Sequence, residues 1–504
     1  MRRVYCLLLF AFVCAVILSA TAQGSHTLTY APGRQITLEL PEPFDINVAA
    51  TGLKRVRFFA KAPDGRIFVT GMRNLSDNRL GSVFILDGWD ERAHRFARVT
   101  HYLDHLRNPN NLTFWTDPAT KQSWLYLPLT DRLVRYKYNA GDKSPASSPE
   151  TLVRFPDYGL HYKYGGWHLT RTVAVVDLHG LTRIFVSVGS SCNYCKEDEV
   201  LRASVVSMDP DGKNQRIEAQ GLRNAVDLRQ VSKLDGGAVF ATNMGDDHLG
   251  DKLPEDTFFE LATEATPTPN YGWPTCYFAD GKPVLDSTPL PSLKDARISG
   301  KTASNPTEGD SVYGEQKGVA AAGTNLSAGG GHEPGGDPNA DLGKAPAPLK
   351  SCDKVPPAYT TFAAHSSPLG FAYFGSDDSN LADSFLVALH GASHPLIGTG
   401  YKVVRFTPSD RRPRDFITGF LTVQNGKPIV HGRPCGILRL DKDTFLLSDD
   451  YLGIIYYVHP RSPKSLRPSV PALQLHHVLS FDLHSVSRLQ SLHLGLRAMQ
   501  TCRP

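Results

Sequence analysis

Residues 183–187 read Arg-Ile-Phe-Val-Ser, and residues 204–212 read Ser-Val-Val-Ser-Met-Asp-Pro-Asp-Gly. β-Branched and aromatic residues fill the apolar part of both segments, as they do in the strands of a sheet. The Asp-Pro-Asp-Gly sequence is typical of a tight turn, because proline and glycine supply the backbone angles that turns need. Together the segments predict two neighbouring strands with a turn after the second.

The same kind of apolar strand recurs along the chain. It begins at residues 66, 124, 183, 238, 384 and 444, so successive starts lie about 55 to 60 residues apart, except for one gap of about 146. Partner strands begin at residues 82, 132, 204, 401 and 454. Strand pairs at even spacing are typical of propeller blades. Six such units predict an all-β protein, a six-bladed β-propeller with four-stranded blades.

A strand near the N-terminus is expected to complete the last blade and close the ring. Residues 36–40, Ile-Thr-Leu-Glu-Leu, alternate between apolar and polar as a half-buried strand does. A tandem of β-sandwiches is the alternative architecture. It would need linkers between domains, and the sequence has none at the corresponding positions.

Three segments stand outside the regular pattern of the propeller, which we place at residues 36–460. Residues 1–22 predict a signal peptide, with two arginines, an apolar run and an Ala-Thr-Ala cleavage site. A membrane anchor is the alternative, but the run is shorter than the ~20 residues that a span needs, and no later stretch is apolar enough. Residues 285–350, rich in Gly, Pro, Ser and Ala, predict a disordered insertion, and residues 461–504 a disordered C-terminal tail.

The charge balance argues against a nucleic-acid partner. The 504 residues include 54 Lys and Arg against 50 Asp and Glu, for a formal net charge of +4. The two signs are interspersed, whereas a nucleic-acid binder needs a basic stripe.

The cysteines indicate an exported protein, extracellular or, in a bacterium, periplasmic. Removal of the signal peptide would leave six, an even number that is typical of disulfides in such chains. Cys192 and Cys195 predict a tight local disulfide; a zinc half-site is the alternative, but the sequence has no second CxxC. Cys276 and Cys352 flank the insertion, and a bridge between them would close its base.

Polar residues at the ends of the predicted strands are the candidates for chemistry, because the loops of a propeller converge at the mouth of its channel. They are His168, Arg223, Asn224, the acidic glycine-rich loop 243–251 with Gly245 and Asp246, His390, Lys402 and Arg433. Histidine can take a proton near neutral pH, arginine and lysine bind anions, and an Asp-rich loop suits Ca²⁺. Each element also has a structural interpretation: a hydrogen-bonding histidine, an arginine that ties blades together, and an ordinary turn or structural Ca²⁺ loop.

Several motifs in order resemble the glucose/sorbosone dehydrogenases, the soluble sugar dehydrogenases that depend on pyrroloquinoline quinone (PQQ). The resemblance covers roughly residues 40–460 without the insertion and extends to sorbosone-type and fungal pyranose dehydrogenase-like members. The matching stretches are Gly-Trp-His-Leu-Thr-Arg-Thr (166–172), Val-Ser-Val-Gly-Ser (186–190), Gly-Leu-Arg-Asn-Ala-Val (221–226), Met-Gly-Asp-Asp-His-Leu-Gly-Asp-Lys-Leu-Pro-Glu-Asp (244–256), Asn-Tyr-Gly-Trp-Pro (270–274), His-Ser-Ser-Pro-Leu-Gly (365–370), Ala-Leu-His-Gly-Ala-Ser (388–393), Gly-Tyr-Lys-Val-Val-Arg (400–405) and Gly-Arg-Pro-Cys-Gly (432–436).

The resemblance implies a role for each candidate. His168 would be the general base, and Arg223 would stabilise negative charge on oxygen beside Asn224 at the reactive PQQ carbonyl. The backbone carbonyls of Gly245 and Asp246 would bind the Ca²⁺ that holds PQQ. Lys402 and Arg433 would face PQQ carboxylates, and His365 and His390 would lie at the same mouth.

The chain departs from the soluble glucose dehydrogenases of this family at three points. Arg433 lacks a closely spaced second arginine, since the next is Arg439. Ser190 or Ser191 replaces a glutamine, and residues 365–368 occupy the region of the aromatic clamp. These features are nearer to the sorbosone-type and fungal members.

The resemblance therefore implies a quinoprotein oxidoreductase that acts on CH–OH or aldehyde groups of a sugar and passes electrons to an external acceptor. Two other functions remain open at this point. A Ca²⁺-dependent hydrolase or lactonase would need metal-binding side chains from several blades, whereas the carboxylates here cluster in one loop. A non-catalytic extracellular propeller would only bind a partner.

Overall fold

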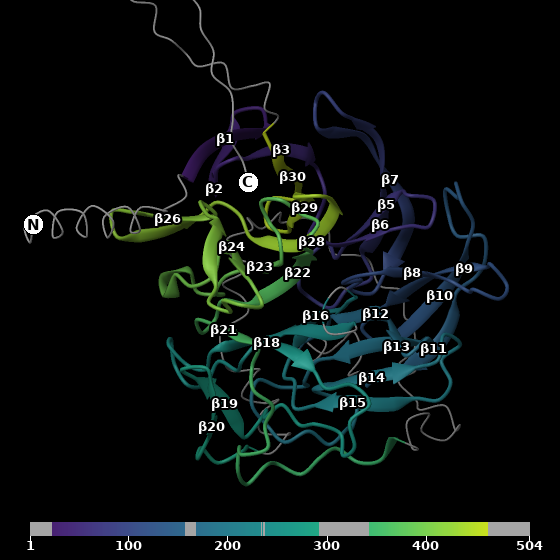
Figure 1. The fold of residues 1–504 in the computed structure, drawn as a ribbon, viewed down its shortest axis with the longest axis vertical. Coiled ribbons are helices and arrows are strands. Elements are labelled where there is room, and N and C mark those ends of the chain that lie inside the picture. The colour runs from purple at the N-terminus through teal and green to yellow at the C-terminus, as the bar shows by residue number, and fades with distance from the viewer. Residues whose placement is uncertain (1–22, 157–167, 233, 235–236, 292–341, 462–504) are drawn as a thin grey trace, which may run out of the picture. The chain divides into compact units, whose positions relative to one another are not determined.

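The computed structural model describes residues 23–156, 168–232, 234, 237–291 and 342–461. The predicted signal peptide, most of the predicted insertion and the tail from Ser462 lie outside these residues. In the unit that ends at Arg461, six four-stranded antiparallel sheets form a six-bladed β-propeller, which confirms the predicted fold class (Figure 1).

The blades follow one another along the chain, and their first strands contact each other in a closed ring around the channel. From the innermost strand outwards, the first blade is β4 (Val56–Lys61), β5 (Ile67–Gly71), β6 (Gly81–Asp90) and β7 (Arg95–Leu106), and the second is β8 (Thr113–Thr116), β9 (Ser123–Pro128), β10 (Arg132–Tyr138) and β11 (Glu150–Arg154). The third blade is β12 (Arg171–Leu178), β13 (Leu181–Val188), β14 (Ser204–Met208) and β15 (Arg216–Gln220), and the fourth is β16 (Ala225–Val231), β17 (Ala238–Asn243), β18 (Asp256–Leu261) and β21 (Thr360–Phe362). The fifth blade is β22 (Pro368–Phe374), β23 (Ser384–Leu389), β24 (Lys402–Phe406) and β25 (Arg414–Ile417), and the sixth is β28 (Pro434–Asp441), β29 (Thr444–Asp449), β30 (Ile454–Pro460) and β3 (Phe44–Ala50).

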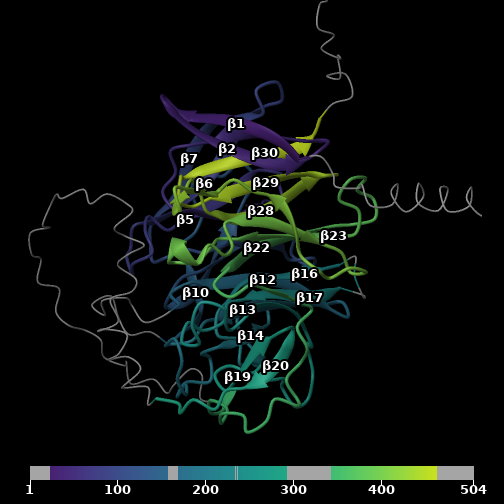
Figure 2. The same ribbon diagram turned by 90° about the vertical axis from the view of Figure 1, so that its left-hand side faces the viewer.

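The ring is closed by β3, so the prediction that residues 36–40 close it was wrong. β3 pairs antiparallel with β30 from the other end of the propeller. Residues 36–40 belong to β2 (Arg34–Pro41), which forms a hairpin with β1 (Gln23–Ala31) beside β30 (Figure 2). Alternation identifies a half-buried strand, but it does not say which sheet the strand joins.

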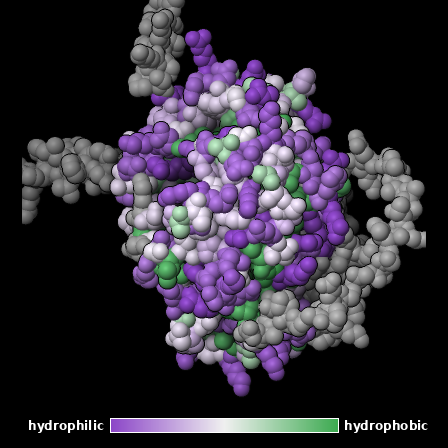
Figure 3. All heavy atoms as spheres, turned by 90° about the vertical axis from the view of Figure 1, so that its right-hand side faces the viewer, coloured by the Kyte–Doolittle hydropathy of each residue, from purple (hydrophilic) through white to green (hydrophobic). Residues whose placement is uncertain are grey.

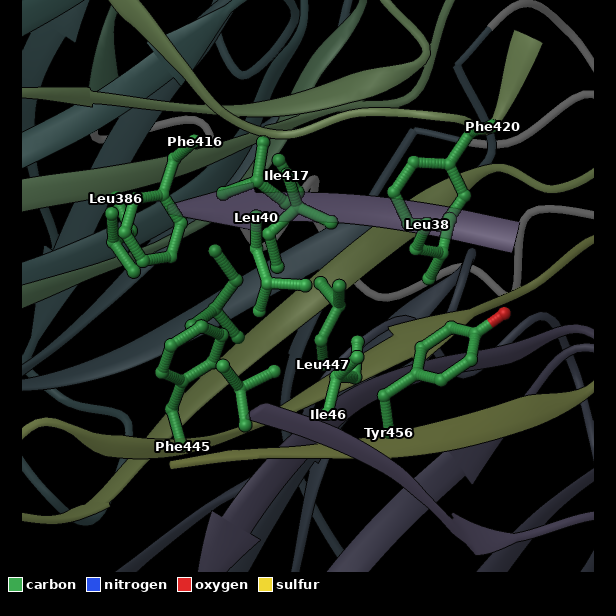
Figure 4. Close-up of a cluster of buried hydrophobic side chains, with 14 of the residues drawn as sticks. Leu38, Leu40, Ile46, Leu386, Phe416, Ile417, Phe420, Phe445, Leu447 and Tyr456 are labelled. Atoms are coloured by element: carbon green, nitrogen blue, oxygen red, sulfur yellow. The ribbon is translucent and has the colours of Figure 1, made fainter. Parts of the chain in front are cut away.

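The β1–β2 hairpin covers the side of the last two blades. Leu38 and Leu40 are fully buried, and Figure 4 shows them between Ile417 and Phe420 on one side and Tyr456 on the other. On the face drawn in Figure 3, hydrophobic residues form small areas among hydrophilic ones. Apolar burial is therefore concentrated between the blades and beneath the hairpin.

Both predicted disulfides are present. Cys192 is bonded to Cys195, and Cys276 of β19 (Cys276–Ala279) to Cys352, 76 residues away. β19 forms a hairpin with β20 (Lys282–Leu285), and a second small hairpin pairs β26 (Leu421–Gln424) with β27 (Lys427–Val430). In the described part of the chain, no helix has the length and apolar character to cross a membrane.

The antiparallel order of the strands puts the candidate residues at one end of the ring. The start of a first strand and the end of a second strand share one edge of a blade. His168, Arg223 and Arg433 precede first strands, and Gly245 and His390 follow second strands. Lys402 pairs with Leu389 at the same edge, two strands out from the channel.

Candidate active site

His168 lies just before β12, and its ring is held by Ser190, which lies in the loop that follows β13. Its Nδ1 is 3.1 Å from the Ser190 carbonyl oxygen and 2.9 Å from Ser190 Oγ. Ser190 Oγ donates its own hydrogen to the Cys192 carbonyl at 2.6 Å, so it accepts from the ring. Nδ1 therefore carries the proton of the neutral imidazole, and Nε2 carries the lone pair.

The surroundings keep His168 neutral. Burial, and then the positive charge of Arg223, hold the pKa of this imidazole well below its usual value. A neutral imidazole with its lone pair on Nε2 can accept a proton from a hydroxyl group.

The approach of His168 to its neighbours requires a glycine at position 189. A Cβ atom there would lie 2.5 Å from His168 Cβ and 2.8 Å from Asn224 Oδ1. Gly189 thus leaves space for the His168 side chain, and Ser190 supplies the hydrogen-bond acceptors for its ring.

Arg223 is buried, at 3% exposure, and its guanidinium is held on several sides. Nε donates to the Asn193 carbonyl at 3.0 Å and Nη2 to Asn193 Oδ1 at 2.6 Å. Nη1 donates to the Gly245 carbonyl at 2.5 Å, and Nη2 also lies 3.3 Å from an Asp247 oxygen. Asn193 was not among the predicted site residues.

Asn224 is the next residue of the chain after Arg223, and the loop that contains Gly245 contacts Arg223. The Asn224 amide oxygen is buried and accepts no hydrogen bond from the described residues. Gly245 donates its N–H to Asp256 Oδ1 at 2.8 Å. The carboxylate of Asp246 lies 2.6 Å from His248 Nδ1 and so forms a partly buried ion pair.

Asp247 links Arg223 to His365. His365 Nδ1 lies 3.1 Å from Asp247 Oδ1, and its Nε2 lies 2.8 Å from the Gly250 carbonyl. The hydrogen bond to Asp247 is the largest cause that raises the pKa of His365 to about 9. His365 is therefore a cation at neutral pH, with its charge balanced by a carboxylate that is 54% exposed. We call these residues the His168 group: His168, Ser190, Asn193, Arg223, Asn224, Gly245, Asp247 and His365.

A second cluster surrounds Asp450, which follows β29 and is fully buried. Asp450 accepts from Arg55 at 3.3 Å, from Arg57 at 3.0 Å and from His390 Nε2 at 2.7 Å. Burial lowers the pKa of His390 to about 4. Arg433 lies 3.5 Å from His390 Nδ1. We call these five residues the Asp450 group.

Arg433 is occupied by backbone groups. It donates to the Gly391 and Ala392 carbonyls at 3.0 Å each and to the Tyr401 hydroxyl at 2.9 Å. Its guanidinium also lies 4.7 Å from the centre of the Tyr401 ring. The side chain thus fixes the loop between β23 and β24.

The two groups are joined through residues 365–367. The His390 N–H donates to the Ser367 carbonyl at 3.0 Å, and the Ser367 N–H donates to Asp256 Oδ2 at 2.8 Å. The other Asp256 oxygen holds Gly245, so one buried carboxylate connects both groups. Burial raises the pKa of Asp256 to about 7.

Lys402 stands apart from both groups. Its ammonium forms an ion pair with Asp415 of β25 at 2.7 Å, towards the outer side of the blade. Over the described ranges, no hydrogen bond or ion pair connects it to the His168 group or the Asp450 group. The structure therefore brings His168, Arg223, Asn224, Gly245 and His365 together, places His390 and Arg433 beside them, and leaves Lys402 at the same end of the ring without a contact.

The His365–Asp247 pair predicts a pH-dependent contribution to stability. The folded-state pKa of His365 is raised to about 9, above the unfolded value, so the stabilisation is complete below the unfolded pKa and disappears as the pH rises through 9. We expect His365→Gln to cost about 1 kcal/mol at pH 6, with allowance for solvent screening of Asp247, and nothing at pH 10. Urea unfolding of both proteins at pH 6, 8 and 10 measures this. The exposed pair of His101 with Asp104 supplies the control His101→Gln, and an equal cost of His365→Gln at all three pH values would contradict the assignment.

Comparison with known proteins supports the fold. Neither a protein-family model nor a curated protein matches the sequence. Among solved structures, a Trichoderma reesei protein of Carbohydrate-Active Enzymes Family AA12 matches with a TM-score of 0.54 and 15% identity, over 84% of this chain and 97% of that chain. The holo form of the pyranose dehydrogenase PQQ domain from Coprinopsis cinerea matches with the same TM-score, identity and coverage. The chain is thus similar in fold to the AA12 protein and to the pyranose dehydrogenase PQQ domain.

Proposed function

We propose that the chain is an exported, PQQ- and Ca²⁺-dependent dehydrogenase that oxidises a sugar or sugar aldehyde and passes the electrons to an external acceptor. One observation carries the proposal: a partly buried neutral imidazole, His168, lies beside a buried guanidinium, Arg223, at the mouth of the propeller. A base next to a fixed cation suits the removal of a hydroxyl proton beside an oxygen that gains negative charge.

The residues present fit an anionic quinone and a hard cation in donor type. The buried Asn224 oxygen has no partner in the described structure, and a buried polar atom of this kind calls for one. Arg223 and the charged His365 supply positive charge at the same place. The carbonyl of Gly245 and the half-exposed carboxylate of Asp247 are oxygen donors of the kind that Ca²⁺ prefers.

Within this proposal, each residue has one task. His168 accepts the substrate proton at Nε2, with Nδ1 fixed by Ser190. Arg223 and Asn224 bind the oxygen at which negative charge develops. When bound, PQQ supplies the two-electron chemistry that no side chain of the protein offers.

The remaining candidates would serve the cofactor from further away. Gly245 and Asp246 would hold Ca²⁺ through their carbonyls, Lys402 and Arg433 would bind PQQ carboxylates, and His365 and His390 would lie at the cofactor site. Gly245 already accepts from Arg223, and Lys402 is paired with Asp415, so both contacts would have to be exchanged for ligand atoms.

Two further predictions form part of the proposal. We propose that residues 1–22 are removed on export, and the two disulfides support an oxidising compartment. We also propose a mature propeller domain at residues 36–460. Leu285 ends β20, Asp286 pairs with His248 at 2.7 Å and Arg461 pairs with Glu42 at 3.0 Å, so the ends of the predicted insertion and tail are ordered. Residues 292–341 and 462–504 of the two segments lie outside the described residues.

The carboxylates of the described residues near the channel do not favour the hydrolase alternative. A metal-dependent lactonase would need free carboxylates from several blades around the channel. Asp450 is instead bound by Arg55, Arg57 and His390, and Asp256 accepts from two backbone N–H groups.

The proposal is tested by titration of the purified apo-protein with PQQ and Ca²⁺, followed by reduction of a dye with aldoses and sorbosone as substrates. We expect reduction only when PQQ, Ca²⁺ and a sugar are all present. Lactone cleavage without PQQ would indicate the hydrolase instead. Failure of PQQ to bind, with no activity in either assay, would leave a binding propeller and overturn the proposal.

A further inference from the structure

Asn193 lies in the four-residue loop that the Cys192–Cys195 disulfide closes, and both of its oxygens point into the His168 group. Its carbonyl accepts from Arg223 Nε at 3.0 Å and from Trp273 Nε1 at 3.2 Å. Its amide oxygen accepts from Arg223 Nη2 at 2.6 Å and from the Asp247 N–H at 3.0 Å. Asn193 alone thus accepts hydrogen bonds from both Nε and Nη2, which form one edge of the guanidinium.

The remaining hydrogen-bond donors of Arg223 show what its contacts with Asn193 achieve. A guanidinium has five N–H groups in a fixed planar fork. Nε and Nη2 use three of them on Asn193 and Asp247, and Nη1 uses one on Gly245. In the described part of the chain, one N–H of Nη1 remains for another acceptor.

The same loop also fixes His168. The carbonyl of Cys192 accepts the hydroxyl hydrogen of Ser190, and Ser190 holds His168 Nδ1. Both cysteines are fully buried against Ala203 and Trp273, and the Tyr194 ring stacks on His248 with 3.8 Å between centroids. The disulfide therefore sits at the point from which both His168 and Arg223 are oriented.

We propose that Asn193, held by the Cys192–Cys195 disulfide, is a positioning residue that presents one N–H of Arg223 to the ligand. The effect on turnover rests on the proposed function, whereas the effect on Arg223 itself does not.

The chemistry of asparagine suits this task. Its neutral oxygen accepts from Arg223 without cancelling the positive charge, so the guanidinium remains available to an anionic oxygen. An aspartate at this position would keep the side-chain acceptor but neutralise the cation, whereas an alanine would remove the side-chain acceptor of Nη2 and keep only the backbone carbonyl that binds Nε. The two substitutions therefore separate position from charge.

The first readout is the Nη2–H signal of Arg223, the group that donates to Asn193 Oδ1, in the NMR spectrum of ¹⁵N-arginine-labelled apo-protein, assigned with Arg223→Lys. We expect Asn193→Ala to speed hydrogen exchange at this group at least about tenfold, because a buried hydrogen bond that loses its acceptor opens more often. Asn193→Asp should keep the wild-type rate within about a factor of two. Unchanged exchange in Asn193→Ala would overturn the positioning role.

The disulfide is tested in the same way. The double variant Cys192→Ser/Cys195→Ser should exchange Arg223 Nη2–H as fast as Asn193→Ala does, because Asn193 Oδ1 would no longer be held in place. Cys276→Ser/Cys352→Ser should keep the wild-type rate. The matched asparagine control is Asn380→Ala. Asn380 lies in the turn at the other end of the fifth blade, and its side chain donates a hydrogen bond to Asp443. A wild-type rate in the Cys192→Ser/Cys195→Ser variant would overturn the role of the disulfide.

The second readout separates this inference from the proposed function. In PQQ-loaded protein, Asn193→Ala should lower kcat about tenfold or more with little change in the sugar KM, since the lost contact acts on developing charge. A protein that binds no PQQ, yet shows the exchange effect, would refute the function and keep the positioning role. If Asn193→Ala does not fold, Asn193→Gln moves the same oxygen by one methylene group and gives the same comparison.

Discussion

His168→Ala is expected to lower kcat by a factor of about 10² to 10⁴, the usual contribution of a general base, while PQQ affinity changes by less than about threefold. His168 contributes its lone pair on Nε2, and it carries no charge at neutral pH with which to hold an anion. Steady-state dye reduction measures kcat, and quenching of tryptophan fluorescence on titration measures PQQ binding.

The control for this experiment is His179→Ala, because the His179 side chain is 91% exposed and pairs only loosely with Glu264 at 3.5 Å. It should leave both quantities unchanged. Full turnover in His168→Ala would show that the substrate proton goes elsewhere. Loss of PQQ binding together with turnover would make His168 a ligand of the cofactor instead of the base.

Asp450→Ala is expected to destabilise the propeller by about 3–5 kcal/mol, as is typical when one partner of a buried charge cluster is removed. The carboxylate is fully buried and satisfies Arg55, Arg57 and His390. These neighbours hold the pKa of Asp450 far below the usual range, so this carboxylate stays ionised across the physiological pH range. Without Asp450, the two guanidinium groups would lie buried with no carboxylate between them.

Thermal unfolding followed by circular dichroism measures this cost as a lower midpoint. The exposed ion pairs of Asp410 with Arg412 and Arg414 provide the control Asp410→Ala, which should leave the midpoint unchanged. A midpoint for Asp450→Ala equal to that of the control would mean that water reaches the channel and compensates both arginines.

The sequence pattern predicted the blades through their second strands. β5, β9, β13, β17, β23 and β29 are buried on both faces, so they appear as short apolar runs at even spacing. The first strands were harder to see, because they line the channel with polar side chains such as Arg57, Thr172 and Asp227. Ring closure by β3 instead of residues 36–40 depended on pairing with a strand about 400 residues away, which no local pattern encodes.

The candidate site was predicted in part. Position at the ends of strands, together with the motif resemblance, found His168, Arg223 and His365, and the structure connects the three through Ser190, Asn193 and Asp247. Asn193 carries no signal of its own between two cysteines. Asp450 did have one, since it follows the second strand of its blade as His390 does. The Lys402–Asp415 pair could not be foreseen, because it depends on the register of β24 and β25.

The partnership of β3 with β30 has a consequence for how the chain is made. β3 leaves the ribosome early, but its partner is completed only after roughly 400 further residues, which takes on the order of 20 to 80 seconds at usual rates of translation. Until then, an unpaired strand edge is available to other nascent chains. We therefore expect a chaperone that covers the edge of β3 to reduce aggregation of the nascent chain until β30 is synthesised.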